Sequence, residues 1–308
     1  MEDKQMRKPY TNMSLVDFQK KFKSEKACRK RLFEIRWPDG FICPRCGHNR
    51  YYDLPKKRLY QCKSCKYQCS VTAGTVMHRT RTPLLKWFWA IFLCSNDKRG
   101  ISALQLSKKL EVSYWVAWTM LHKIRQAMKD RDADYKLAGL IEVDDSYIGG
   151  SSQGGGNKRG RGTHKTSVII AASTNGKGIG YAKMEIVDSL NEEQVRKVLQ
   201  KGISPSQTIK SDGWQSYNVA EELGHAHEIE MILGRKAHDV LKWVHILASN
   251  AKTFILGTYH GLGTKHLQSY LDEYCYRFNR RRWHAQLFDR LLMACAVSKG
   301  ITFSELTQ

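Results

Sequence analysis

The sequence predicts a multidomain α+β protein, in which a small metal-binding module and a helical segment precede a larger α/β domain with a mixed sheet. Three observations predict this class. Two C-x-x-C pairs lie between residues 43 and 65. Helical spacing of apolar residues dominates 82–128, and from Leu140 onward strand-like runs alternate with helical ones. A chain of 308 residues with 42% apolar content is long enough for two or three domains.

We place domain boundaries where these patterns change. The predicted domains are 1–80, with an N-terminal helix and the cysteine pairs, 81–135, which is helical, and 136–308. Ser14 or Asp17 is a candidate cap for the first helix, and the polar stretch from Lys129 to Asp134 is predicted to be a linker.

The predicted elements follow apolar periodicity. Helices are expected at 83–94, 101–110, 114–124, 191–202, 240–256 and 265–281, and strands at 141–148, 167–173, 180–187 and 207–210. Three strands followed by helix, strand and helix indicate a mixed sheet covered by helices. The glycine-rich, basic segment 149–162 cannot pack a core, but it can follow a phosphate backbone.

Charge points to the class of partner. The formal net charge is +22 and is spread along the chain, which favours a polyanion over the alternative of a merely solvated basic surface. Residues 1–10 have no apolar core typical of a signal peptide, and the apolar run 84–94 contains Lys86 and is too short for a bilayer. We therefore expect a cytoplasmic, nucleoid-associated protein with reduced cysteines.

The strongest single motif is the set of paired cysteines. Fifteen residues separate the two pairs, a spacing at which four thiolates surround one structural Zn²⁺; its members are Cys43, Cys46, Cys62 and Cys65. The alternative, redox dithiols or buried free thiols, lacks the surrounding βαβ pattern. Cys69 is expected to be a packing thiol. Basic residues make this module suited to DNA, namely Lys56, Lys57, Arg58, Lys63 and Lys66.

The helical segment predicts a helix-turn-helix. Ser113 can cap its second helix, which would enter the major groove. The apolar contacts are assigned to Leu104, Leu106, Leu110, Val112, Val116 and Leu121. Tyr114 and Trp118 near the start of that helix are unusual readers of bases, so an ordinary helical hairpin is the alternative.

Acidic residues mark the candidate catalytic centre. Glu142, Asp144 and Asp145 lie in an otherwise apolar strand, where alternation puts Asp144 and Asp145 on opposite faces, so only one of them can share a site with Glu142. Asp212 ends a later strand, a position that suits a divalent-cation site, although a turn or cap role is the simpler reading of Asp212 alone.

Two helical stripes complete the candidates. His245, Ser249 and Lys252 share one helix face, whereas Asn250 points away from His245, and either His245 or Asn250 is a candidate third metal ligand. On the next helix one acid and two guanidiniums recur at helical spacing, namely Glu273, Arg277 and Arg280. This stripe is either a salt-bridged solvated face or a clamp for a DNA end.

Together these motifs resemble prokaryotic insertion-sequence transposases with an N-terminal zinc ribbon and a DDE-type integrase domain, related to the Merlin-type DNA transposons. The resemblance spans about 42–282. It rests on the four cysteines, on EVDDSYIGG at 142–150, on SDGW at 211–214, and on the blocks at 249–252, 257–261 and 270–281.

The resemblance implies a ribonuclease H-like catalytic domain in which Asp144 and Asp212 are the first two members of a triad. It also implies that Lys252 contacts DNA and that Glu273, Arg277 and Arg280 form the downstream Glu-Arg-Arg signature. The third triad position holds no Glu. Branches of the family that use Asn favour Asn250, whereas the two-turn spacing to Lys252 favours His245.

The activity implied is two-metal phosphoryl transfer with Mg²⁺ or Mn²⁺, acting on terminal inverted repeats and target DNA. Pairing two ends implies a homodimer or a larger assembly. Two rival functions remain: a non-catalytic DNA-binding regulator, such as a domesticated transposase, and a nuclease that cleaves without joining strands.

Overall fold

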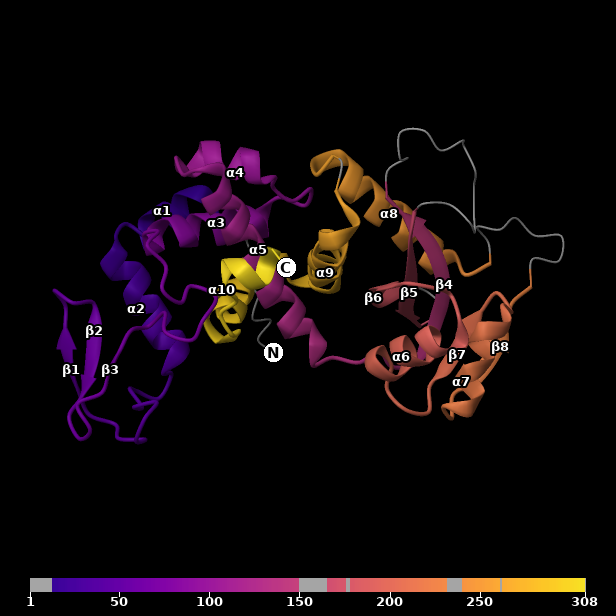
Figure 1. Ribbon diagram of the computed structural model, residues 1–308, viewed down its shortest axis with the longest axis horizontal. Coiled ribbons are helices and arrows are strands. Elements are labelled where there is room, and N and C mark those ends of the chain that lie inside the picture. Colours follow the sequence, from indigo (N-terminus) through magenta and orange to yellow (C-terminus); the bar gives the residue numbers. More distant parts are fainter. Residues whose placement is uncertain (1–12, 150–164, 176–177, 232–239, 261, 308) are drawn as a thin grey trace, which may run out of the picture. The chain divides into compact units, whose positions relative to one another are not determined.

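The computed structural model describes residues 13–149, 165–175, 178–231, 240–260 and 262–307 (Figure 1). Contacts between residues divide the chain into two compact units. Unit 1 comprises Met1–Asp97, Ala103–Ala127 and Arg282–Gln308, and unit 2 comprises Lys98–Ser102 and Met128–Arg281. The predicted boundaries at 80 and 135 remain predictions, but by contacts the C-terminal segment groups with the N-terminal residues.

Unit 1 begins with two short helices, α1 (Leu15–Lys21) and α2 (Glu25–Arg36). Ser14 and Asp17 act together at the first of them, because the Ser14 hydroxyl accepts the Asp17 N–H at 3.0 Å and the Asp17 carboxylate accepts the Ser14 N–H at 3.3 Å. A three-stranded antiparallel sheet follows, formed by β1 (Tyr51–Leu54), β2 (Leu59–Cys62) and β3 (Gln68–Cys69).

Helices complete unit 1. They are α3 (Leu84–Asn96), α4 (Ala103–Leu110), most of α5 (Tyr114–Ala133), the 3-10 turn η2 (Arg281–Gln286), α10 (Leu287–Val297) and α11 (Phe303–Thr307). Phe18 and Phe22 of the N-terminal helices contact Phe288 of α10, with both ring centroids 5.6 Å from it. These aromatic contacts explain why the last helices group with the first ones.

The predicted linker at 129–134 is wrong, because α5 continues to Ala133. The stretch is polar, but it contains no glycine or proline and its charged residues are good helix formers. Met128 is buried, and Asp132 pairs with Arg280 of unit 2 at 2.7 Å. The polar composition therefore reflects a helix with an exposed side, not a break.

Unit 2 is built on a five-stranded sheet with order β6-β5-β4-β7-β8. The strands are β4 (Leu140–Ile148), β5 (Thr166–Thr174), β6 (Ile179–Val187), β7 (Thr208–Ser211) and β8 (Ala226–Ile229). The first three are antiparallel neighbours, whereas β7 and β8 run parallel to β4. This order and these directions are those of the ribonuclease H-like fold, so the predicted fold class is confirmed.

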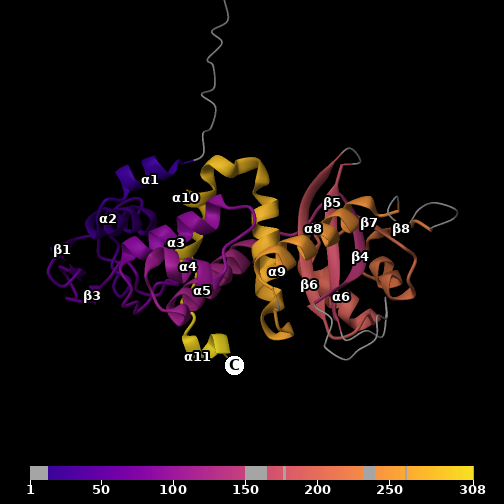
Figure 2. The same cartoon turned by 90° about the horizontal axis from the view of Figure 1, so that it is seen from above.

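Helices cover both faces of this sheet (Figures 1 and 2). One face packs against α8 (Lys242–Thr258) and α9 (Thr264–Asn279), through residues such as Ile170, Leu247 and Leu271. The other packs against α6 (Glu192–Gly202) and the short helices η1 (Gln215–Asn218) and α7 (Val219–Glu222). Alternation along β4 decides the face: Ile141 and Val143 point to α6, so Glu142 and Asp144 point to the side of α8.

Within the described ranges, no helix combines the length and the apolar character that crossing a bilayer requires. The predicted N-terminal segment 1–10 and most of the glycine-rich segment 149–162 lie outside the described residues.

Candidate active site and zinc site

The four cysteines of the ribbon converge on one point. Their ligand atoms all lie within 4.8 Å of one another, and Cys43 Sγ and Cys65 Sγ are 3.6 Å apart, as are Cys46 Sγ and Cys62 Sγ. A tetrahedron with Zn–S bonds of about 2.3 Å has edges of roughly 3.8 Å, so the cluster has the size that a zinc ion requires. Four thiolates leave no open position, which fits a structural ion.

Tight turns shape the two cysteine knuckles. The Gly47 N–H donates to the Cys43 carbonyl at 2.9 Å, and Gly47 adopts φ +72°. In the second knuckle Lys66 takes the left-handed conformation. Cys69 stays apart from the cluster, buried with its Sγ 3.8 Å from the Tyr60 carbonyl, as expected of a packing thiol.

The helix-turn-helix elements form as predicted. The Ser113 hydroxyl accepts the Val116 N–H at 3.3 Å and caps α5. Leu106, Leu110 and Leu121 are buried, but the assignment of Leu104 to the core is wrong, because it is 56% exposed. It lies two positions from Leu106, which places it on another side of α4.

The start of α5 presents aromatic residues. Tyr114 and Trp115 are exposed, whereas Trp118 packs against His122 and Phe303, with ring centroids 4.1 Å and 6.1 Å away. Trp118 therefore serves packing within unit 1. Docking of α5 in the major groove remains a prediction.

Asp144 and Asp212 are brought together by the register of two parallel strands. Leu140 pairs with Thr208, Ile141 with Ile209 and Glu142 with Lys210. Extending this register by two positions sets Asp144 opposite Asp212, on the same face of neighbouring strands that are about 4.8 Å apart. This register, continued past Lys210, would place Asp144 in the middle of β4 beside Asp212, which directly follows β7.

Local hydrogen bonds fix both acids. The Asp144 side chain is largely buried, and its Oδ1 accepts the N–H of Asp145 at 2.8 Å. Asp212 Oδ1 accepts the N–H of Trp214 at 3.0 Å, which makes Asp212 the first residue of an Asx turn as well as an end-of-strand acid. Gly213 has φ +83°, and a Cβ there would come within 2.7 Å of Ile229, so the turn requires glycine.

Helix α8 places His245 near Asp144. The His245 Nε2 lies 4.0 Å from Asp144 Oδ2. Asn250 is exposed and faces Tyr274 of α9. In this arrangement His245, and not Asn250, is the polar group of α8 that lies beside Asp144.

The three groups form a loose cluster. Among the described residues, only the four cysteines form a set of three or more metal-ligating side chains with all ligand atoms within 4.8 Å. Asp144, Asp212 and His245 would have to move closer together to share one ion. Carboxylate oxygens and an imidazole are nevertheless ligands that Mg²⁺ and Mn²⁺ accept.

Glu142 has a role that the sequence did not reveal. Its Oε2 accepts the N–H groups of Trp243 and Val244, at 2.8 Å and 3.2 Å, and so caps the first turn of α8. Burial raises the pKa of Glu142, although these two hydrogen bonds act against that shift. The contact ties α8 to β4 at the two residues directly before His245, so Glu142 positions the helix rather than joining the site.

We expect Glu142→Ala to destabilise unit 2 by about 1–3 kcal/mol, because it leaves two buried N–H groups without an acceptor. Glu142→Gln keeps a carbonyl oxygen for these donors and should recover most of the loss. Urea unfolding of both variants, with the exposed Glu193→Ala as control, measures the effect. Equal stability of Glu142→Ala and the parent would contradict the capping role.

Sequence reasoning also missed Glu230. The register of β7 and β8 pairs Thr208 with Ala226, and its extension sets Glu230 opposite Asp212. Lys210 Nζ lies 3.8 Å from Glu230 Oε2 and 3.7 Å from Glu228 Oε2. The strand β8 is too short and polar to be identified from periodicity, and this acid went unnoticed with it.

Lys252 lies two turns along α8 from His245 and is half-buried. Burial lowers the pKa of Lys252, and the nearby charge of Lys165 lowers it further. No carboxylate in the described residues forms an ion pair with it. A cation in this state is suited to bind a phosphate, as the resemblance implies.

The stripe on α9 is buried. Glu273 is 2% exposed, and its Oε1 accepts hydrogen bonds from Arg277 Nε at 2.9 Å and from an Arg277 terminal nitrogen at 2.7 Å. Arg280 pairs with Asp132 of α5 and lies over the Tyr276 ring, with 3.6 Å between the guanidinium carbon and the ring centroid. These contacts hold α9 in place and rule out a solvated face, whereas the DNA clamp stays a prediction.

Asp272, next to this stripe, is a second buried acid, and its burial makes the stability of the fold depend on pH. Burial raises the pKa of Asp272 from 3.8 to about 6, and its Oδ2 lacks a hydrogen-bond partner in a small cavity beside Lys183 and Lys201. Well below pH 3.8 the carboxyl is protonated in both folded and unfolded chains. Between pH 4 and 6 only the unfolded chain ionises freely, so stability is lost as pH rises.

Asp272→Asn removes this ionisation. The variant should gain up to about 3 kcal/mol over the parent at pH 7.5 and show none of this gain at pH 3.5. Urea unfolding at the two pH values tests this, with Asp188→Asn removing an exposed acid as control. A difference between variant and parent that does not change with pH would refute it.

Comparison with known proteins identifies two transposase domains in the chain. Residues 136–279 match the model of the ISXO2-like transposase domain, and residues 23–68 match that of the transposase zinc-ribbon domain. Both models describe domains of IS1595 transposases, and together they cover more than half of the chain. The chain is therefore a transposase that contains a zinc-ribbon domain and an ISXO2-like transposase domain. The resemblance predicted from its motifs is thereby confirmed.

One relative and two solved structures are similar to this chain. The uncharacterized protein in transposable element ISH50 of Halobacterium salinarum is 27% identical over 217 residues, which cover 66% of the transposase and 72% of that protein. A pre-cleavage Mos1 transpososome is 12% identical with a TM-score of 0.29, over 65% of this chain and 75% of that one. The Mos1 strand transfer complex is 13% identical with a TM-score of 0.30, over 65% and 74%. At these TM-scores the strand order, not the superposition, identifies the fold.

The zinc-ribbon match includes all four cysteines and helix α2. The transposase-domain match begins before β4 and ends with α9, so it contains Asp144, Asp212, His245 and Asn250. The candidate site therefore lies wholly inside the matched domain of the transposase.

Proposed function

We propose that this transposase binds the terminal inverted repeats of its element and catalyses metal-dependent strand cleavage and strand transfer, with Asp144 and Asp212 as the essential acids. The observation that supports this most is the strand register, whose extension beyond Glu142 and Lys210 would bring the two carboxylates to neighbouring positions on the helix-covered face. A largely buried acid within β4 and a half-buried acid just after β7 are costly to fold unless they serve a charge-dependent function.

Each neighbouring group has a proposed part. Asp144 and Asp212 would hold divalent ions, which when bound lower the pKa of a water and stabilise the charge of the reacting phosphate. Lys252 would bind a phosphate of the DNA strand, and Glu142 would keep α8 in register above the acids. Two copies of the chain would pair the two ends of the element.

For the third ligand we favour His245 over Asn250. His245 Nε2 is 4.0 Å from Asp144 Oδ2, whereas Asn250 faces α9. A neutral imidazole in place of a third carboxylate lowers the negative charge of the site, which favours Mn²⁺ over Mg²⁺ relative to a site with three acids. Activity in Mn²⁺ should therefore exceed activity in Mg²⁺.

The test uses the full chain and DNA that carries the inverted repeats flanking its gene. With Mn²⁺ or Mg²⁺ we expect nicks at the repeat boundary that leave 3′-hydroxyls, and then joints between these ends and a target plasmid. Binding without nicks would indicate the DNA-binding regulator instead. Nicks without joints would indicate a nuclease.

A further inference from the structure

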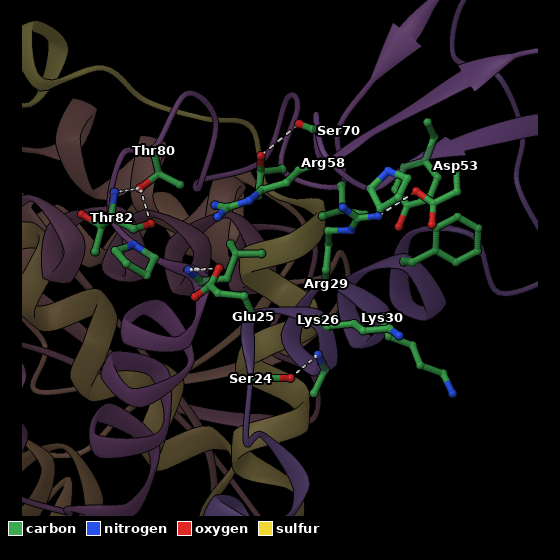
Figure 3. A pocket seen from close by; sticks show the side chains of 18 of the residues that line it. Ser24, Glu25, Lys26, Arg29, Lys30, Asp53, Arg58, Ser70, Thr80 and Thr82 are labelled. Atoms are coloured by element: carbon green, nitrogen blue, oxygen red, sulfur yellow. Dashed lines mark hydrogen bonds and ion pairs between the residues drawn. The ribbon is translucent and has the colours of Figure 1, made fainter.

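Unit 1 contains a cleft of about 870 Å³ that none of the groups above uses (Figure 3). Helix α2 forms one wall, the hairpin of β1 and β2 forms another, and residues 70–84 close it. Five basic side chains line it, namely Lys26, Arg29, Lys30, Arg58 and Arg81; with the rest of this lining they define what we call the basic cleft.

The two acids of the basic cleft are already engaged. The Glu25 carboxylate accepts the N–H groups of Leu84 and Leu85, at 3.0 Å and 2.7 Å, and so caps α3. Asp53 accepts a hydrogen bond from Arg29 at 2.8 Å (Figure 3). Neither carboxylate neutralises the remaining cations.

Four cations of the basic cleft therefore stay available. They are Lys26, Lys30, Arg58 and Arg81, all exposed, and no acid in the described part of the chain forms an ion pair with them. Lys26 and Lys30 are four residues apart on α2, so they lie on the same face of that helix. Like charges gathered in this way repel one another until an anion binds between them.

The aromatic wall of the basic cleft favours a phosphate backbone over stacked bases. Tyr60 is 5% exposed and packs against Phe33 and Tyr51, with ring centroids 5.0 Å and 5.4 Å away. The Arg29 guanidinium lies over the Tyr60 ring, 5.1 Å from its centroid. The ring faces are thus engaged by the protein itself, and no platform is open for a base.

Hydroxyl groups add neutral donors. Ser70 and Thr72 face each other at 3.0 Å, and Thr80 and Thr82 lie across the basic cleft near the start of α3. Hydroxyl and cationic groups together are the usual partners of phosphate oxygens.

We propose that the basic cleft grips the sugar–phosphate backbone of duplex DNA, as an anchoring surface distinct from the predicted recognition helix α5. This proposal depends on the proposed function in one respect, namely that the bound DNA is an end of the element. Arg58 occupies the turn between β1 and β2 with φ +57°, and β2 ends at the zinc ligand Cys62. The zinc site thus fixes one wall of the DNA-binding surface.

The test measures binding of the full chain to a random-sequence 30-base-pair duplex over a range of salt concentrations, without added Mg²⁺ or Mn²⁺. One variant changes Lys26, Lys30, Arg58 and Arg81 to Gln. A matched control changes Lys20, Lys23, Arg290 and Lys299, four exposed cations of the same unit, to Gln. Zinc content and thermal melting must match the parent for both.

We expect the plot of log K against log salt to be less steep for the cleft variant, with the magnitude of its slope smaller by about 3 to 4. Binding of the duplex at 0.15 M salt should weaken by roughly ten- to a hundredfold. The control should keep the slope of the parent. DNA should also protect Lys26 and Lys30 from acetylation in the parent. Equal losses in both variants, or no loss in either, would overturn the proposal, as would tighter binding of a single strand than of the duplex.

The proposed catalytic function can fail independently. Because this assay contains no catalytic metal, it measures duplex binding whether or not the protein nicks DNA. A transposase that nicks end DNA while its cleft variant binds normally would refute the cleft alone.

Discussion

Changing Asp144 to Asn is expected to reduce metal-dependent nicking of end DNA by roughly a thousandfold or more, because it removes a charged ligand worth several kcal/mol of transition-state stabilisation. Asp212→Asn should have the same effect, since register places the two acids as one pair. Asparagine has nearly the shape of aspartate and accepts the same backbone N–H groups, so folding should be kept. Initial rates on labelled end DNA in Mn²⁺ measure the loss.

The matched control is Asp145→Asn. Asp145 is the next residue of β4, and alternation turns it to the opposite face from Asp144. The nicking rate of the Asp145→Asn variant should stay within about threefold of the parent rate, a difference of less than about 1 kcal/mol in activation free energy. If Asp145→Asn lost as much activity as Asp144→Asn, the assignment of faces would be wrong.

The second large effect concerns the ribbon. Cys62→Ser should abolish zinc binding and unfold residues around β1 to β3, because structural zinc contributes roughly 10–16 kcal/mol and the small sheet has little core of its own. Duplex binding should weaken with it, as one wall of the basic cleft is lost. Zinc content by metal analysis and duplex binding by anisotropy measure both changes.

Cys69→Ala is the control for the ribbon. Cys69 is buried near the cluster but lies outside the set of four ligands. The Cys69→Ala variant should keep one zinc per chain and bind DNA as the parent does. A ribbon that stays folded and binds DNA normally without zinc would refute the structural role of the metal.

Features encoded in short stretches were predictable. The spacing of the four cysteines gave the metal cluster, and alternation in β4 separated Asp144 from Asp145. Ser113 was identified as the cap of α5 because capping depends on residues three positions apart. In each case the interacting groups are close in the sequence or share one period.

Features that depend on partners far away in the sequence could not be predicted. Glu142 caps a helix about a hundred residues away, so nothing near it distinguishes it from a site acid. The burial of Glu273 follows from the packing of α9, since the same stripe on a surface helix would be solvated. The basic cleft brings α2 beside the ribbon hairpin, and Lys26 and Lys30 look like any exposed helix face until that contact is seen.

The choice between His245 and Asn250 shows the same limit. Helical spacing related His245 to Lys252 but gave no contact with β4. The distance of 4.0 Å from His245 to Asp144 arises from the docking of α8 on the sheet, which Glu142 secures.

The most direct measurement of the central claim is anomalous diffraction from crystals of the transposase soaked in Mn²⁺. We predict manganese peaks between the carboxylates of Asp144 and Asp212, with His245 as the third protein ligand. Manganese bound elsewhere in the chain, with no peak between these two acids, would contradict the account.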